Sequence, residues 1–216
     1  MIVSSFTVGP FEENSYLVAD AGSRRAVLID PGDEGPRLVR GVKAAGVELE
    51  GIWLTHAHID HIGGIAAVLR EWAVPVWLHP LDRPLYDDGA KHAAIYEVPF
   101  EQPPPPDREL VEGQAVEVGG LRFDVLHLPG HSPGHVAFRG HGMLFGGDVL
   151  FAGSVGRTDL PFSEPAQLER SLARLATLPP ETQVHAGHGP QTTIGAELRT
   201  NPFMTGRARI SGAARR

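Results

Sequence analysis

The chain contains no cysteine. Disulfide bonds and thiolate ligands are therefore excluded, and any metal ion would be held by histidine and carboxylate side chains, which suit zinc, iron or manganese. No apolar run approaches the ~20 residues that a membrane-spanning helix needs. Residues 1–14 lack a basic stretch followed by a long apolar run, so no secretory signal is expected. These absences favour a cytoplasmic protein without a membrane partner.

Positive charge is also in short supply. The 216 residues include 19 Lys and Arg against 26 Asp and Glu, for a net charge of -7. Nucleic acids are bound largely through Lys and Arg, so a nucleic-acid partner is not expected, although local charge can still capture a small anion. The hydrophobic share of 42% is enough for the core of one globular domain.

Two runs of β-forming segments, each followed by helical patterns, indicate two packed sheets with helices outside. The first run predicts strands over 2–8, 15–18, 25–30, 51–55 and 74–78, with helices over 35–45 and 60–72. The second predicts strands over 116–118, 121–126, 136–138, 143–145 and 183–185, with helices over 165–178 and 194–200. Between the runs, residues 99–107 contain four consecutive prolines and predict an extended surface loop, or alternatively a flap over a substrate.

Residues 55–61, Thr-His-Ala-His-Ile-Asp-His, carry the main chemical signal. The segment follows a predicted strand and precedes a predicted helix, so one turn brings together His56, His58, Asp60 and His61. Burying these groups behind an apolar strand would cost several kcal/mol unless a cation compensated. The cluster therefore indicates a metal site or a catalytic site.

Three further segments place ligand-type residues just beyond predicted strands. His131 lies among glycines and prolines, Asp148 follows Gly146-Gly147, and His188 lies between two glycines. Together with the first cluster they make five histidines and two aspartates, which are too many for one tetrahedral ion. Two ions that share one carboxylate would use them all, and such pairs lie ~3.5–4 Å apart in hydrolytic sites.

This ordered set of motifs resembles the metallo-β-lactamase superfamily, and within it the hydroxyacylglutathione hydrolases (glyoxalase II), particularly the short bacterial ones. Besides residues 55–61, the matching stretches are 28–32 (Leu-Ile-Asp-Pro-Gly), 131–135 (His-Ser-Pro-Gly-His), 147–151 (Gly-Asp-Val-Leu-Phe), 187–189 (Gly-His-Gly) and 201–203 (Asn-Pro-Phe). The resemblance implies an α/β fold, a four-layer αββα sandwich of two mixed β-sheets flanked by helices.

The resemblance also implies the ligand set. The first metal would be held by His56, His58 and His131, the second by Asp60, His61 and His188, with Asp148 bridging the two. The cofactors would be two divalent ions, with zinc preferred and iron or manganese as alternatives. Asp30 would orient a ligand histidine. His135, like His127 and His185, adjoins a ligand segment, and a supporting role beside the metal ligands is expected for it above the other two.

The chain departs from the full-length enzymes of this family in two places. Those enzymes carry a C-terminal helical domain that binds glutathione, whereas fewer than 30 residues follow His188 here. A hydrolase domain over 1–200 and a C-terminal tail over 201–216, without a separate glutathione-binding domain, are therefore expected. In the loop after Asp148, Arg157 keeps the family's basic residue and is a candidate for substrate binding, but Asp159 stands where the family has Tyr.

The predicted activity is cleavage of a thioester, S-lactoylglutathione or a related hydroxyacyl thioester, by metal-bound hydroxide. Asp60 is a candidate proton acceptor as well as a ligand. One alternative is a persulfide dioxygenase with a single iron, because residues 156–159 (Gly-Arg-Thr-Asp) are similar to that class. The non-enzyme alternative is a metal-binding structural module. The β-lactamases fit less well, since they usually have a different residue where His61 stands.

Overall fold

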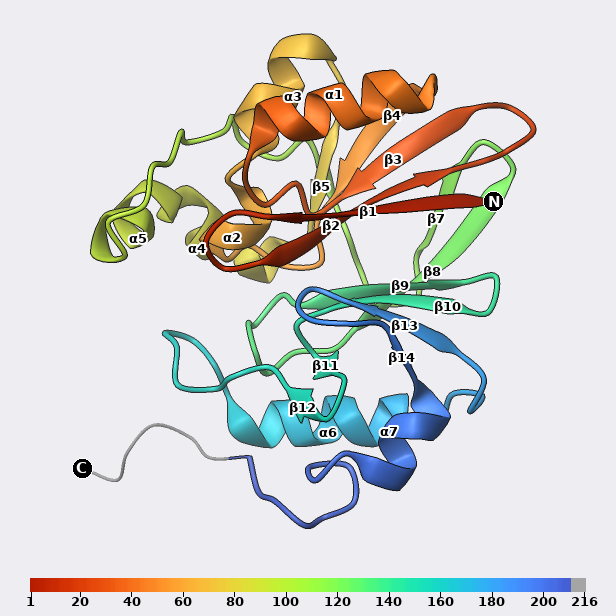
Figure 1. Cartoon of the computed structure of the whole chain (residues 1–216). Coiled ribbons are helices and arrows are strands. Elements are labelled where there is room, and N and C mark those ends of the chain that lie inside the picture. The colour runs from red at the N-terminus through yellow and green to blue at the C-terminus, as the bar shows by residue number, and fades with distance from the viewer. Residues whose placement is uncertain (211–216) are drawn as a thin grey trace.

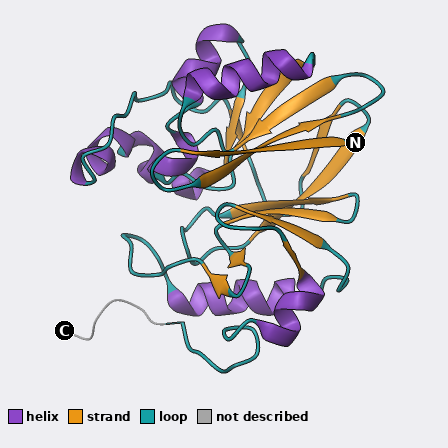
Figure 2. Ribbon diagram, in the orientation of Figure 1, coloured by secondary structure: helices purple, strands orange, loops and turns teal. Residues whose placement is uncertain are grey.

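The computed structural model of the chain describes residues 1–210, so the last six residues of the predicted tail lie outside the described part. Two six-stranded sheets lie face to face in the middle of the molecule (Figure 1). Helices α1 (Gly35–Ala45) and α3 (Ile65–Glu71) cover the outer face of one sheet, and α6 (Pro165–Leu175) and α7 (Ile194–Thr200) cover the other (Figure 2). The predicted αββα sandwich is confirmed.

Both sheets are mixed. The first has the strand order β1 (Ile2–Val8), β2 (Glu13–Ala19), β3 (Arg25–Ile29), β4 (Glu48–Trp53), β5 (Val76–Leu78), β6 (Arg108–Glu109). The strands from β1 to β3 pair antiparallel, and the strands from β3 to β6 pair parallel. The second has the order β14 (Thr192–Thr193), β13 (Gln183–Ala186), β10 (Met143–Gly147), β9 (Val136–Gly140), β8 (Leu121–His127), β7 (Ala115–Val118). A small hairpin pairs β11 (Leu150–Phe151) with β12 (Ser154–Val155).

Alternation along the strands builds three apolar layers. In β2, Tyr16 and Val18 face the other sheet, whereas Leu17 and Ala19 pack under α1 and α3. The second sheet likewise turns Phe123 toward the first sheet and other side chains toward α6. Central strands such as β3 are therefore buried on both faces, which explains why they read as short continuous apolar runs.

The predicted helix over 60–72 is wrong as a single element. It forms two helices, α2 (Ile59–Ile62) and α3, interrupted at Gly63 and Gly64. A Cβ atom on Gly63 would lie 2.5 Å from the carbonyl oxygen of Gly32, so this backbone passes directly beneath the loop that follows β3. The close contact bends the chain here and ends the first helix after one turn.

The segment between β5 and β6 holds elements that the sequence did not predict: a 3₁₀ turn η1 (Pro80–Asp82), α4 (Arg83–Asp87) and α5 (Gly89–Ile95). β6, β11, β12 and β14 were also unpredicted, and α6 ends at Leu175 rather than at 178. Residues 99–106 form no helix or strand, as expected for a proline-rich connection. Within residues 1–210 no helix combines the length and apolar character needed to cross a membrane.

Candidate metal centre

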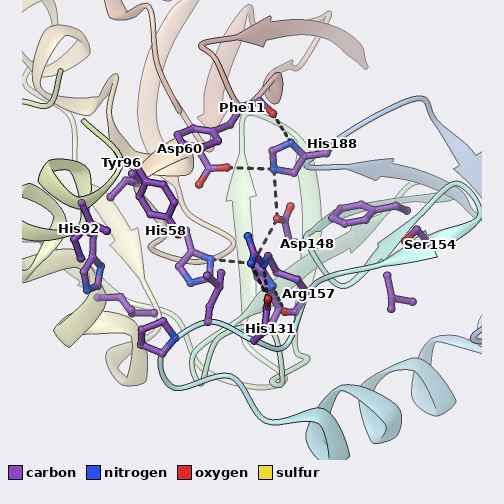
Figure 3. Close-up of a pocket in the computed structure, with 18 residues that line it drawn as sticks. Phe11, His58, Asp60, His92, Tyr96, His131, Asp148, Ser154, Arg157 and His188 are labelled. Atoms are coloured by element: carbon purple, nitrogen blue, oxygen red, sulfur yellow. Dashed lines mark hydrogen bonds and ion pairs between the residues drawn. The ribbon is translucent and has the colours of Figure 1, made fainter. Parts of the chain in front are cut away.

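The seven side chains predicted as metal ligands converge at one edge of the two sheets. They lie in loops that follow β4, β8, β10 and β13 and in the short helix α2. The strands β8, β10 and β13 run in the same direction, so their carboxyl ends meet at one edge of the second sheet. Figure 3 shows the converging side chains from both sheets, with His58, Asp60, His131, Asp148 and His188 labelled.

Three histidines form one group, the three-histidine group: His56, His58 and His131. One ring nitrogen of each lies within 4.8 Å of the corresponding nitrogens of the others. The Nδ1 of His58 is 2.9 Å from the Nε2 of His131. His56 and His131 are buried, and the Nε2 of His56 has no hydrogen-bond partner among residues 1–210. These spacings match the donor set that a tetrahedral ion requires.

A second group, the aspartate group, consists of Asp60, His61 and His188. Its ligand atoms also lie within 4.8 Å of one another. The Nε2 of His188 is 3.2 Å from Asp60 Oδ2, and the Nε2 of His61 is 3.9 Å from the same oxygen. His61 is fully buried, whereas Asp60 and His188 are partly exposed.

Asp148 faces both groups. Its Oδ1 lies 3.4 Å from the Nε2 of His61, and its Oδ2 lies 3.4 Å from the Nε2 atoms of His131 and His188. Among the carboxylates of residues 1–210, Asp148 alone lies within 4.0 Å of histidines of both groups. The carboxylate therefore occupies the position expected of a ligand shared by two ions.

Asp30 forms a third cluster with His56 and His61, but its oxygens already have partners. It accepts hydrogen bonds from the backbone N–H and the hydroxyl of Thr55, at 2.7 and 2.6 Å. Its Oδ2 is also 3.1 Å from the Nδ1 of His61, on the side of that ring away from Asp148. Asp30 is thus placed to orient the His61 ring rather than to face the other ligand atoms.

Two of the other ligand rings, those of His131 and His188, are held by backbone carbonyls. The Nδ1 of His131 lies 2.8 Å from the carbonyl oxygen of Arg157, and the Nδ1 of His188 lies 3.0 Å from that of Phe11. A ring that donates its Nδ1 proton to a carbonyl leaves the Nε2 lone pair free for a ligand. His135 contacts the site differently, since its Nε2 accepts a hydrogen bond from the backbone N–H of Asp148 at 2.9 Å. The sequence did not reveal the carbonyl partners, because any residue type can supply one.

Burial and charge divide the two groups. Burial lowers the pKa of His56 well below its usual value and lowers the pKa of His58 to about 3. Burial also opposes the protonation of His188, but the Asp148 and Asp60 carboxylates outweigh it and raise the pKa of His188 to about 10. The same two carboxylates raise the pKa of His61 well above its usual value, against burial. Burial also lowers the pKa of His131, so the rings of the three-histidine group are neutral near pH 7 and can donate lone pairs to an ion.

Several buried atoms at this point lack hydrogen-bond partners within the described residues: His56 Nε2, His61 Nε2 and Asp148 Oδ1. An unsatisfied buried polar atom costs about 1–3 kcal/mol, so three of them aimed into one small space require an explanation. Divalent cations would satisfy all three at once. The residues present therefore fit a metal centre.

A cavity of about 590 Å³ opens above this centre. Its lining includes Leu85 of α4, Ile95 at the end of α5, and Tyr96, together with Phe151 and Leu160. In Figure 3, His92 and Tyr96 lie on one side of the ligand side chains and Ser154 lies on the other. The walls are largely apolar. No residue of the segment 99–107 is among the lining residues of the cavity, and the carbonyl of Pro104 accepts a hydrogen bond from the hydroxyl of Tyr86 in α4.

Arg157 also lines the cavity, but its side chain is already paired with a neighbouring carboxylate. The guanidinium forms a two-pronged ion pair with Asp159, at 2.5 and 2.8 Å, and the side chain is 58% exposed. The residue contacts the metal centre only through its carbonyl oxygen, which accepts from His131.

A family model described as the metallo-beta-lactamase superfamily matches residues 8–188. Among curated proteins, the chain is 35% identical to the hydroxyacylglutathione hydrolase GloC of Haemophilus influenzae, over 96% of this chain and 100% of that protein. Both matches span the residues of the metal centre.

Solved structures with the same fold include proteins of different stated function. The di-iron-bound form of TTHA1623 is 50% identical, with a TM-score of 0.87 over 93% of this chain and 100% of that one. BLEG-1, a B3 metallo-beta-lactamase, is 37% identical, with a TM-score of 0.89 over 94% and 100%. ETHE1 from Myxococcus xanthus is 30% identical, with a TM-score of 0.81 over 95% and 85%. The family match and these relatives establish that the chain belongs to the metallo-β-lactamase superfamily of metal-dependent hydrolases.

Proposed function

We propose that the protein is a dinuclear metal hydrolase that cleaves a thioester, S-lactoylglutathione or a related hydroxyacyl thioester. The observation that carries the dinuclear part is the Asp148 carboxylate, which lies 3.4 Å from a histidine of each ligand group. The stated function of the H. influenzae relative supports the thioester part. The cavity supports an enzyme over a structural module, because structural zinc sites are closed and this one opens onto about 590 Å³.

Each ligand group would hold one ion. His56, His58 and His131 would bind the first, Asp60, His61 and His188 would bind the second, and Asp148 would be shared. When bound, the two ions would supply Lewis acidity and water activated at neutral pH. Zinc is our preferred ion; iron and manganese also suit nitrogen and carboxylate ligands, and TTHA1623 has been crystallised with two irons.

The protein's own residues would position the reaction. Hydrogen bonds from the Nδ1 atoms of His131 and His188 to carbonyl oxygens fix the two rings on opposite sides of Asp148. Asp60 lines the cavity and has an 18% exposed side chain, so it is our candidate to accept the proton of the attacking water. Attack at the thioester carbonyl carbon gives a tetrahedral intermediate, which expels the thiolate. A thiolate leaves readily, so no protein acid is required for this step.

The cavity walls suggest how a substrate would be held. Its apolar surfaces, with Ile95 and Tyr96 on one side, would pack against hydrocarbon parts of the thioester. We propose that Arg157 binds an anionic group of the substrate, exchanging its ion pair with Asp159 for one with the ligand.

The second candidate is a persulfide dioxygenase with a single iron. The observation in its favour is the stretch Gly156–Asp159, which is similar to that class and whose Arg157 carbonyl holds His131. The observation against it is the complete aspartate group, which a single-iron site would leave without a role.

The two candidates differ in their need for a redox metal and oxygen. Zinc has no accessible redox chemistry, so a zinc-loaded hydrolase works without oxygen whereas a dioxygenase does not. We expect zinc-loaded protein to cleave S-lactoylglutathione anaerobically, and iron-loaded protein to show no substantial oxygen uptake with glutathione persulfide. Rapid oxygen uptake by the iron form, with no thioester cleavage by either form, would establish the second candidate instead.

A further inference from the structure

A buried carboxylate outside both ligand groups connects the loops of the three-histidine group. Asp82 ends the 3₁₀ turn η1 and is fully buried. Its Oδ2 accepts hydrogen bonds from the backbone N–H of Ala57 at 3.0 Å and from the hydroxyl of Ser132 at 2.7 Å. Its Oδ1 accepts from the backbone N–H of Gly134 at 2.5 Å. Both oxygens are therefore occupied by donors from two loops.

These donors belong to the segments that carry all three histidines. Ala57 lies between His56 and His58, in the loop after β4 of the first sheet, and Ser132 follows His131, in the loop after β8 of the second. A Cβ atom on Gly134 would lie 2.8 Å from Asp82 Oδ1, so a glycine is needed for the approach. One carboxylate thus joins two loops that the sheets deliver separately.

We propose that Asp82 is a positioning residue that fixes the spacing between His131 and the His56–His58 pair, and thereby sets the affinity of the three-histidine group for its ion. The inference rests on the ligand assignment of the proposed function and not on the thioester substrate. The two oxygens of Asp82 accept from three donors: the N–H of Ala57, the O–H of Ser132 and the N–H of Gly134. An ionised carboxylate is the side chain that can accept on both of its oxygens.

An amide of the same shape cannot replace this carboxylate. If the amide nitrogen of Asp82→Asn takes the place of Oδ1, it faces the backbone N–H of Gly134; if it takes the place of Oδ2, it faces that of Ala57. In either orientation an amide N–H would face a backbone N–H with no acceptor between them, and this loss of a hydrogen bond would loosen the loop that carries the backbone donor. Substitution of such outer partners typically lowers metal affinity ~10–100-fold.

The effect should be confined to one group. Within residues 1–210, the side chains that orient the aspartate group bond to other partners: His61 to Asp30, and His188 to the carbonyl of Phe11. None of the hydrogen bonds of Asp82 reaches these residues. If Asp82 had only a structural role, its substitution would weaken the binding of both ions alike or would only lower the stability of the fold.

The test is a Zn²⁺ titration of metal-free protein, followed by NMR of ¹⁵N-labelled histidine rings and by calorimetry. In Asp82→Asn we expect the rings of His61 and His188 to respond as in the wild type. The rings of the three-histidine group should respond only at ~10–100-fold higher free Zn²⁺. Equal weakening of both groups, or of neither, would overturn the inference.

Glu197→Gln is the matched control. Glu197 is also buried, and its oxygens accept from a hydroxyl, a side-chain amide and a backbone N–H, supplied by Thr192, Asn201 and Gly153. The control should lose stability without a selective change in Zn²⁺ binding.

If Asp82→Asn does not fold, Ser132→Ala removes one donor to the same carboxylate and should shift the three-histidine group in the same direction by less. A selective shift in neither variant counts against Asp82. The proposed function is tested separately, by the number of Zn²⁺ equivalents that the wild type binds. Binding of a single equivalent would refute the dinuclear site, but the responses of the three histidine rings could still be compared between variants. Wild-type protein that binds no Zn²⁺ refutes both.

Discussion

His185 should make the fold sensitive to acid. It lies in β13, between the two sheets, and is 3% exposed. Its ring stacks on Phe145 with centroids 4.8 Å apart and meets Tyr16 edge-on at 5.3 Å. Neither ring nitrogen has a hydrogen-bond partner within residues 1–210. Burial lowers the pKa of His185 from 6.5 to about 4, because the charged ring is poorly solvated there.

The direction in which pH changes the free energy of unfolding depends on whether the folded or the unfolded state takes up the proton at higher pH. Below about pH 6.5 the unfolded chain protonates this histidine while the folded protein does not, so acid favours unfolding until the pH reaches about 4. Between pH 7.5 and pH 5 this group alone should remove about 2 kcal/mol from the free energy of unfolding. The variant His185→Leu has no ionisable group at this position, so it lacks this dependence on pH. It loses ~0.5–1.5 kcal/mol of ring contact but no longer buries unsatisfied nitrogens at ~1–3 kcal/mol each.

The assay is urea unfolding of wild type and His185→Leu from pH 7.5 to pH 5, in chelator so that both are metal-free. The other titrating groups are common to both proteins and cancel in the difference. The variant should gain about 2 kcal/mol on the wild type as the pH falls. Val184→Ala, at the buried neighbour in β13, is the control, since its cost should not vary with pH. A difference between wild type and His185→Leu that stays constant over this range would refute the reasoning.

Three further predictions concern the metal centre. Metal-free protein reloaded with Zn²⁺ should approach two equivalents by elemental analysis, and a firm plateau at one would contradict the shared position of Asp148 between the two groups. Asp148→Asn should lower hydrolysis at least ~100-fold, because an amide cannot neutralise two cations, and a near-normal rate at full metal loading would show that Asp148 is not the bridge. Arg157→Ala should raise KM for an anionic thioester more than it lowers kcat, since a remote ionic contact holds substrate and transition state alike. An unchanged KM for anionic and neutral thioesters alike would leave Arg157 as a loop charge paired with Asp159.

The layered fold was predictable because it depends on patterns that persist along the chain. Runs such as Arg25–Ile29 are buried on both faces and bounded by turn residues, and α1 and α7 match their predicted ranges of 35–45 and 194–200. The break at Gly63 was not predictable from periodicity, because it arises from contact with Gly32, which lies about thirty positions earlier in the chain. Long-range contact overrode the local helical pattern.

The candidate site was predictable only for side chains that ligate by type. Histidine and aspartate beyond strand ends could be recognised one by one, and the structure brings all seven together. The wall formed by α5 was missed, because Gly89–Ile95 is short and has no extended apolar stripe. Asp82 was missed for a different reason: a lone aspartate before a helix resembles an ordinary turn residue, and its three donors lie far away in sequence.

The two ligand groups are held by different partners, although both draw their ligands from loops of both sheets. In the three-histidine group, the buried Asp82 carboxylate connects the loop after β4 with the loop after β8. The aspartate group is tied to β3 and the β1–β2 hairpin, through Asp30 and the carbonyl of Phe11. Phe11 also lines the cavity and packs edge-on against Tyr96, another lining residue, with ring centroids 5.7 Å apart. A ligand that displaces Phe11 from Tyr96 would therefore move the hairpin whose carbonyl orients His188, so we expect binding in the cavity to change the geometry of the aspartate group.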